Sequence, residues 1–287
     1  MTVTCPICKG QQLRRHWKLG QFQFLRCSDC LCVFSEQHLD QSYWNQYYNN
    51  GYHRARGHGG SDSGVERAKR ATFRKFYRLP ALPSPPARLL EVGCGTGDAI
   101  QVAHEMGFEC VGVDISNEAI ADAKRRFPDL AFYAGKIEQL PFSSGFFDVI
   151  ALFDAIEHFI DAHSLADALT GLLAPNGRIL IVTPNMESLS AKILGPRWFH
   201  AFSEHVLLYC PKSLAHLLKP RGFTCLHQGF AWKWITLDML FRHSEAHRHI
   251  AGGNWIRKMP ALLPSVLREM IFPFNIGEFY AIYQKKS

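Results

Sequence analysis

The feature that most constrains this chain is a glycine-rich turn between two apolar segments. Residues 89–97 read Leu-Leu-Glu-Val-Gly-Cys-Gly-Thr-Gly, and a second apolar segment, residues 111–114, ends on Asp114. In an α/β sheet such glycines let the backbone turn sharply and approach a ligand, while the acid after the next strand accepts hydrogen bonds from a ribose. The turn therefore predicts an adenosine-containing ligand at the carboxyl ends of parallel strands.

The spacing of the glycines separates two kinds of ligand. Gly93, Gly95 and Gly97 form a G-x-G-x-G pattern and Asp98 follows at once, whereas a dinucleotide-binding turn reads G-x-G-x-x-G. An acid in that place is a poor neighbour for a pyrophosphate. The pattern therefore favours a ligand without phosphate.

Apolar and amphipathic segments alternate along the rest of the chain, which predicts a parallel sheet with helices on both faces. The expected strands are residues 88–92, 110–113, 131–134, 147–153, 178–183 and 278–283, and the expected helices are residues 66–77, 98–106, 118–126, 164–173 and 212–218.

The glycine turn, residues 91–97, resembles the first motif of class I S-adenosylmethionine (SAM)-dependent methyltransferases. The resemblance continues in order over roughly residues 88–230, through Asp114 and the segments 139–142, 147–150, 154–158 and 177–181. It implies an α/β, Rossmann-like, seven-stranded sheet that binds SAM. We expect this domain to span residues 86–287, with an acceptor-pocket insertion at about residues 230–275.

The resemblance also implies which residues bind the cofactor. The expected set is Glu91 near the methionine ammonium, the turn glycines Gly93, Gly95 and Gly97, Asp114 on the ribose, Ile115 on adenine, Phe153 on the methionine side, and Tyr52 from a lid. Lys136 stands where related enzymes carry an acid, and lysine cannot accept a hydrogen bond. Two interpretations follow: adenine recognition rests on backbone groups at Ile137, or this end of the site is looser than usual.

Two C-x-x-C pairs, Cys5 with Cys8 and Cys27 with Cys30, stand at the start of the chain. Four thiolates at this spacing can close a tetrahedral structural Zn²⁺ site. Residues 1–40 are therefore predicted to form a zinc ribbon with a hairpin around Gly20. The N-terminus lacks the pattern of a signal peptide, so we expect a reducing, cytoplasmic location in which the nine cysteines are thiols or metal ligands.

The ribbon and the linker that follows it each have two interpretations. Basic residues and Trp17 on the ribbon could contact RNA, or they could form the solvated face of a structural module, which we favour. Residues 41–85 are expected to contain a linker and lid helices. Their aromatic side chains, including Tyr48 and Tyr52, could cover the SAM site or only pack the ribbon onto the core.

The segment Asp154-Ala-Ile-Glu157-His158 carries the candidate catalytic residues. It lacks the prolines of enzymes that methylate amino groups of bases, and it resembles the Glu-His motif of ubiquinone-pathway methyltransferases. His158 is a candidate general base, and His205 is a second. Asp154, Glu157 and His158 have the spacing of a divalent-cation site, although Glu157 could instead cap a helix.

These observations predict methyl transfer to oxygen or carbon of a small-molecule acceptor, such as a secondary metabolite, sugar or quinone. The alternative is an RNA methyltransferase whose ribbon binds the substrate, because a net charge of +7 permits nucleic acid without requiring it. No apolar run is long enough for a transmembrane helix. The insertion could roof the acceptor, touch a membrane surface or form a dimer contact, so a monomer and a homodimer both remain open.

Overall fold

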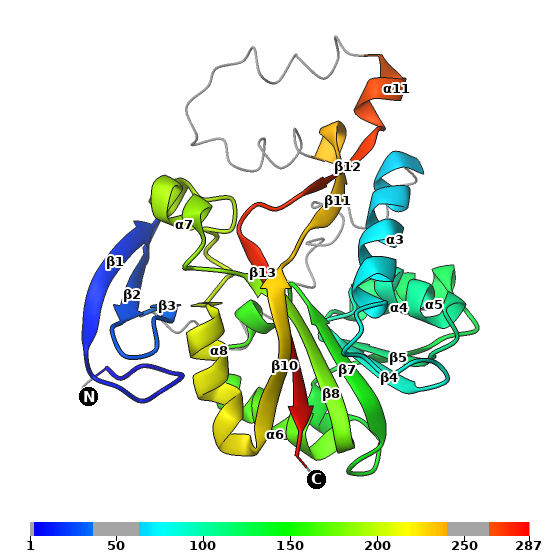
Figure 1. Ribbon diagram of the computed structural model, residues 1–287, viewed down its shortest axis with the longest axis horizontal. Coiled ribbons are helices and arrows are strands. Elements are labelled where there is room, and N and C mark those ends of the chain that lie inside the picture. Colours follow the sequence, from blue (N-terminus) through cyan, green and yellow to red (C-terminus); the bar gives the residue numbers. More distant parts are fainter. Residues whose placement is uncertain (1–2, 37–62, 240–263, 287) are drawn as a thin grey trace.

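The computed structural model describes residues 3–36, 63–239 and 264–286. Its centre is a seven-stranded sheet with the order β10-β13-β8-β7-β4-β5-β6 (Figure 1). The strands β4 to β8 are parallel, while β13 lies antiparallel to both β8 and β10. The expected seven-stranded α/β sheet is confirmed. Its strands are β4 (Arg88–Val92), β5 (Glu109–Asp114), β6 (Ala131–Ala134), β7 (Phe147–Phe153), β8 (Leu173–Pro184), β10 (Phe223–Phe230) and β13 (Glu278–Lys285).

Helices cover both faces of this sheet, because each face carries its own apolar core. One core takes side chains from α3 (Ser63–Tyr77), α4 (Asp98–Glu105) and α5 (Asn117–Arg126). The other takes side chains from α6 (Ala162–Leu172) and α8 (Pro211–Leu218). Helix α6 begins two residues before the expected start, because the Asp161 carboxylate caps it by accepting from the backbone N–H groups of His163 and Ser164.

The N-terminal segment forms the expected hairpin, β1 (Leu13–Leu19) and β2 (Phe22–Cys27), with Gly20 in the turn. Two further strands complete this small sheet in the order β1-β2-β3-β9. Strand β3 (Val33–Ser35) follows the hairpin, but β9 (Leu207–Leu208) comes from the central part of the chain. The ribbon sheet is therefore continuous with the larger domain (Figure 1).

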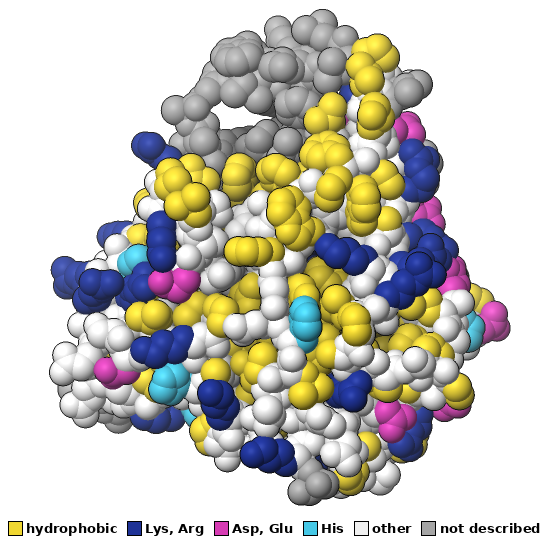
Figure 2. Space-filling view, viewed as in Figure 1, with side chains coloured by type: hydrophobic (Ala, Val, Ile, Leu, Met, Phe, Trp, Pro, Cys, Tyr) yellow, Lys and Arg dark blue, Asp and Glu magenta, His cyan; other side chains and the backbone are white. Residues whose placement is uncertain are grey.

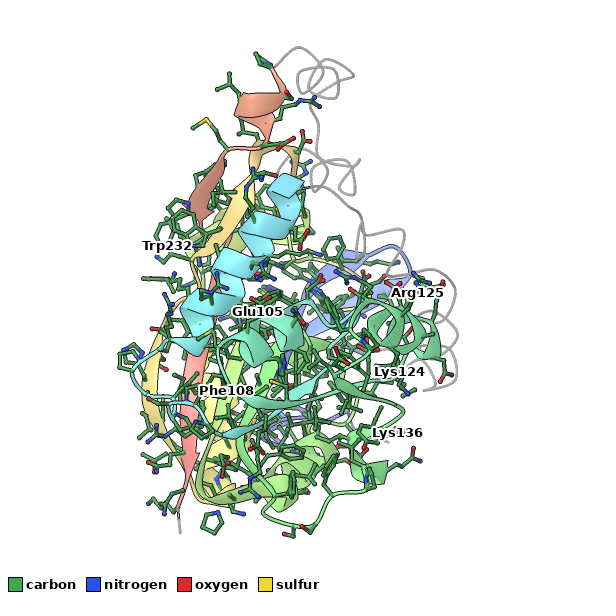
Figure 3. The ribbon with its side chains drawn as sticks, turned by 90° about the vertical axis from the view of Figure 1, so that its right-hand side faces the viewer. Glu105, Phe108, Lys124, Arg125, Lys136 and Trp232 are labelled. Atoms are coloured by element: carbon green, nitrogen blue, oxygen red, sulfur yellow. The ribbon has the colours of Figure 1, made fainter. Side chains whose placement is uncertain are left out.

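A third, two-stranded sheet lies beyond the carboxyl ends of the parallel strands. Strand β11 (Lys233–Thr236) pairs with β12 (Ile271–Phe274), and short helices α7 (Leu189–Leu194) and α11 (Ser265–Arg268) lie at the same end of the molecule. Helix α3 runs alongside this pair (Figure 3), where the Trp234 N–H donates to Thr72 Oγ1 at 2.7 Å. The described part of the expected insertion thus forms a β-strand pair over the sheet.

The surface at this end is apolar. Figure 2 shows hydrophobic side chains gathered where α7, β11 and β12 lie. Its most exposed large apolar residues are Leu189, Ile193, Phe230, Trp232 and Met270. Among the helices that the structure describes, none has the length and hydropathy to span a bilayer.

Candidate functional site

The glycine turn between β4 and α4 has the geometry that its sequence predicts. Gly93 and Gly97 have φ angles of +77° and +83°, in the left-handed region that favours glycine. A Cβ atom added to Gly93 would lie 2.7 Å from the Ala155 Cβ, so the turn runs directly against the segment that follows β7. This contact brings the glycine turn and residues 154–158 to one place at the edge of the sheet.

Asp114, at the end of β5, is nearly buried and fixes the turn. Its two carboxylate oxygens accept from the backbone N–H groups of Gly95 and Ser116, each at 2.9 Å. A carboxylate oxygen has more than one acceptor site, so both oxygens keep capacity for the hydroxyls of a ribose. Asp114 therefore lies at the end of its strand, as the sequence predicts, and its hydrogen bonds also hold the glycine turn in place.

Glu91, at the end of β4, is buried and incompletely satisfied. Its Oε2 has no hydrogen-bond partner among the described residues. Burial, together with the charges of Asp98 and Asp114, raises its pKa well above the usual value. A buried acceptor without a donor is costly, so a cationic ligand group here would relieve this cost. This fits the expected role near a methionine ammonium.

The other expected cofactor residues lie in different environments. Phe153, at the end of β7, packs against Phe73, Phe76 and Tyr77 of α3, with ring centroids 5.1–5.8 Å apart. Ile115 is half-buried after β5, and Ile137 is buried in the 3-10 turn Ile137–Gln139. Tyr52 and Tyr48 lie outside the described residues, so the structure does not test the lid.

Asp98, the acid after the turn, is an ion-pair partner. Its oxygens lie 3.0 Å from Lys69 Nζ of α3 and 2.6 Å from the Arg126 guanidinium of α5. Burial alone would raise the pKa of Asp98, but these two cations outweigh it and lower the pKa below the usual value. The acid thus joins three helices beside the turn.

The candidate catalytic residues fall into two groups. Glu157 is fully buried in the 3-10 turn Ile156–His158 and accepts from Thr183 Oγ1 at 2.8 Å. Burial, with a smaller contribution from Asp154, raises the pKa of Glu157 to about 8. The ligand atoms of Glu157, His158 and His205 all lie within 4.8 Å of one another. We call these three side chains the Glu-His-His cluster.

Backbone carbonyls orient both histidines of the cluster. His158 Nδ1 lies 3.0 Å from the Glu204 carbonyl oxygen, and His205 Nδ1 lies 2.8 Å from that of His200. The two rings meet edge to face with centroids 4.8 Å apart. His205 comes from the loop before β9, so the structure joins two candidate bases that are remote in sequence.

Asp154 is held apart from this cluster. Its carboxylate lies 2.5 Å from Lys233 Nζ, which also lies 2.6 Å from the buried Glu278. Burial opposes the charge of Lys233, but the two carboxylates outweigh it and raise the pKa of the lysine. Sequence reasoning missed Lys233, Glu278 and Thr183, because no motif marks them and each comes from a distant strand.

The four cysteines of the two C-x-x-C pairs lie together. Their Sγ atoms are within 4.8 Å of one another, with Cys5 to Cys30 and Cys8 to Cys27 each at 3.5 Å. Leu31 has a φ of +67°, and its N–H donates to the Cys27 carbonyl at 3.0 Å. Cys32 is fully buried and outside the group. A cysteine cluster is therefore present.

A family model described as a methyltransferase domain matches residues 65–228. Among curated relatives, a demethylmenaquinone methyltransferase of Beutenbergia cavernae is 33% identical over 104 residues, covering 36% of this chain and 43% of the relative. A ubiquinone biosynthesis O-methyltransferase of Brucella anthropi is 28% identical over 146 residues, covering 48% and 56%. The chain thus spans about half the length of these relatives.

Solved structures show the same fold. The [4+2]-cyclase SpnF aligns with a TM-score of 0.58 at 17% identity, covering 85% of this chain and 96% of that one. A SAM-dependent methyltransferase from Archaeoglobus fulgidus aligns with a TM-score of 0.52 at 19% identity, covering 86% and 100%. At such identities the likeness concerns the fold alone.

Proposed function

Because this chain belongs to the methyltransferase-domain family, we propose that it transfers the methyl group of SAM to oxygen or carbon of a small-molecule acceptor. The observation that carries this proposal is the contact of Gly93 with Ala155. It sets the glycine turn beside the segment that bears Glu157 and His158. A cofactor held at the turn would then face a group of side chains able to act on an acceptor.

The residues at the turn fit SAM. Asp114 would hold the ribose hydroxyls, and the unpartnered oxygen of Glu91 would meet the ammonium of the methionine part. Among the described residues near the turn, Lys69 and Arg126 are both paired with Asp98, so neither is left to balance a phosphate. When bound, SAM supplies a methyl group on a sulfonium sulfur.

An acceptor oxygen or carbon must lose a proton before or during methyl transfer, and a positioned side chain can promote this loss. The Glu-His-His cluster is the group best placed to do so. The names of the two relatives, a demethylmenaquinone methyltransferase and a ubiquinone biosynthesis O-methyltransferase, support a hydroxylated, quinone-like acceptor. The apolar surface around α7 and β11 is compatible with such a molecule.

We also propose that Cys5, Cys8, Cys27 and Cys30 bind a structural Zn²⁺. Four sulfur ligands close a tetrahedral site, and the Sγ distances permit it. The ribbon's Trp17 is buried and Arg26 pairs with Glu187, so these side chains serve packing within the protein. This favours the structural role of the ribbon over RNA binding.

The test is calorimetric titration of the full chain with S-adenosylhomocysteine, followed by turnover assays with catechols and hydroquinones. Asp114→Asn should weaken binding at least tenfold, because it replaces a charged acceptor on the ribose. Asp129→Asn, at an exposed acid away from the turn, is the matched control. Absence of binding to the wild-type chain would exclude the proposal.

A further inference from the structure

We propose that Glu157, His158 and His205 bind a divalent transition-metal ion, distinct from the zinc of the ribbon. This inference rests on the proposed function, because it states how the acceptor site of that reaction promotes loss of a proton. Nothing in the sequence pairs His205 with the Glu157-His158 motif, and the fold alone brings them together.

The geometry of the three side chains suits one ion. Their ligand atoms all lie within 4.8 Å of one another. Ligand atoms that each lie about 2.0–2.2 Å from one ion are closer to one another than 4.8 Å. Small side-chain rotations would bring the three ligand atoms into this range. Two imidazoles and one carboxylate form a set that leaves other positions on the ion open.

A second, independent observation comes from Glu157. One of its oxygens accepts from Thr183, but Oε1 is buried without a hydrogen-bond partner in the described part of the chain. The side chain itself is fully buried. A buried carboxylate oxygen with no donor is unfavourable unless a cation binds it. The unsatisfied atom belongs to the same residue that completes the ligand set.

The histidines are arranged as metal ligands usually are. Each places Nδ1 against a backbone carbonyl, His158 on Glu204 and His205 on His200. When Nδ1–H donates to a carbonyl, the lone pair of the ring is on Nε2, and this contact fixes the tautomer and orientation of a metal-binding imidazole.

The ligand set also selects the ion. The sequence trio Asp154, Glu157 and His158 would offer two carboxylates to a hard cation. The structure instead pairs Asp154 with Lys233 and supplies His205 in its place. Two nitrogen donors and one oxygen favour Zn²⁺, Fe²⁺, Co²⁺ or Mn²⁺ over Mg²⁺ or Ca²⁺.

The open positions on this ion would take the hydroxyl oxygen of the acceptor. A bound cation lowers the pKa of such a hydroxyl, and its proton passes to water. An electron pair of the oxygen then forms the bond to the methyl carbon, while the carbon–sulfur bond breaks and its electron pair stays on sulfur. The products are the methyl ether and S-adenosylhomocysteine.

Zinc stoichiometry tests the proposal. The full chain is loaded with Zn²⁺, passed through a desalting column and analysed by inductively coupled plasma mass spectrometry. We expect about two zinc ions per wild-type chain and about one in His158→Gln and His205→Gln. His216→Gln, at an exposed histidine of α8, should keep both. One ion in the wild type, or two in the cluster variants, would refute the proposal.

A measurement on the wild type alone covers the case in which a variant does not fold. After mild chelation and titration with Mn²⁺, pulsed electron paramagnetic resonance should detect imidazole nitrogen coupled to the bound ion. Absence of bound Mn²⁺ or of this coupling counts against the site. Titration of the same samples with S-adenosylhomocysteine separates the two proposals, since the cofactor can bind whether or not the second metal does.

Discussion

The close approach of the glycine turn to Ala155 makes Gly93→Ala the most informative substitution. The new Cβ would lie 2.7 Å from the Ala155 Cβ, closer than two methyl carbons can pack, and the residue has a φ of +77°. Left-handed backbone costs a residue with a Cβ about 1–2 kcal/mol, and overpacking costs about 1–3 kcal/mol. We expect the free energy of unfolding to fall by about 2–5 kcal/mol and affinity for S-adenosylhomocysteine to fall at least tenfold.

A double-mutant cycle separates these two contributions. Ala155→Gly removes the clashing methyl group but leaves the strained backbone at position 93. The coupling between the two substitutions, measured by urea denaturation, should therefore be about 1–3 kcal/mol. Gly171→Ala is the control, because a Cβ there meets nothing within 4 Å and its φ is not positive. It should leave stability unchanged or raise it by up to about 1 kcal/mol.

The double-mutant cycle directly tests the contact between Gly93 and Ala155. If Gly93→Ala costs the same in the wild-type and Ala155→Gly backgrounds, the turn does not run against the segment after β7. The cofactor turn and the Glu-His-His cluster would then not be adjacent, and the proposed function would lose the observation that carries it.

Three further predictions concern charges and metal. Lys233→Met should lower the free energy of unfolding by about 2–4 kcal/mol, measured in urea, because it leaves the buried Glu278 carboxylate without its cation; a change below 0.5 kcal/mol would contradict the ion pair. Asp98→Asn should destabilise the chain at neutral pH but not in acid, because ion pairs lower the pKa of Asp98 in the folded chain. The contribution of Asp98 to the free energy of unfolding is therefore present above the unfolded pKa of about 4 and disappears as the pH falls through the folded pKa. Equal losses at pH 7 and pH 3 in thermal melts would refute this. Removal of the Zn²⁺ that we propose for the ribbon should lower both the melting temperature and turnover, and unchanged turnover would separate the ribbon from the acceptor site.

Much of the geometry of the glycine turn and of Asp114 could be predicted from sequence, because its signals are local. The turn glycines have positive φ angles that few other residues adopt. Asp114 ends a strand whose apolar pattern is continuous, and its carboxylate bonds to backbone groups close in the chain or in the adjoining turn. Periodicity and turn chemistry therefore specify this region without knowledge of distant contacts.

The surroundings of Asp154 and His205 could be predicted only in part, because the residues that contact them are distant in sequence. Asp154 has the same spacing whether it faces a cation or a lysine, and Lys233 belongs to a strand that no pattern identified. Strand β9 has two residues, too few for any periodicity, and it exists because β3 supplies its hydrogen-bonding partner. Strands β10, β11 and β12 were missed for a similar reason, since pairing determines them more than composition does.

The position of β9 explains why the ribbon should matter for turnover. The Ser35 N–H of the ribbon donates to the Val206 carbonyl at 3.0 Å, one residue after His205. Further along the chain, Cys210 Sγ contacts the Cys30 carbonyl at 3.7 Å. The residues that directly follow His205 are thus held by the part of the chain that contains the four cysteines. The ribbon packs its buried apolar side chains into the same core as α6 and α8, while Arg14, Arg15 and Lys18 of β1 remain exposed. Loss of the metal proposed for the ribbon should therefore displace His205 from Glu157 before it affects the glycine turn, whose Cys94 packs into the other core, with α4 and α5.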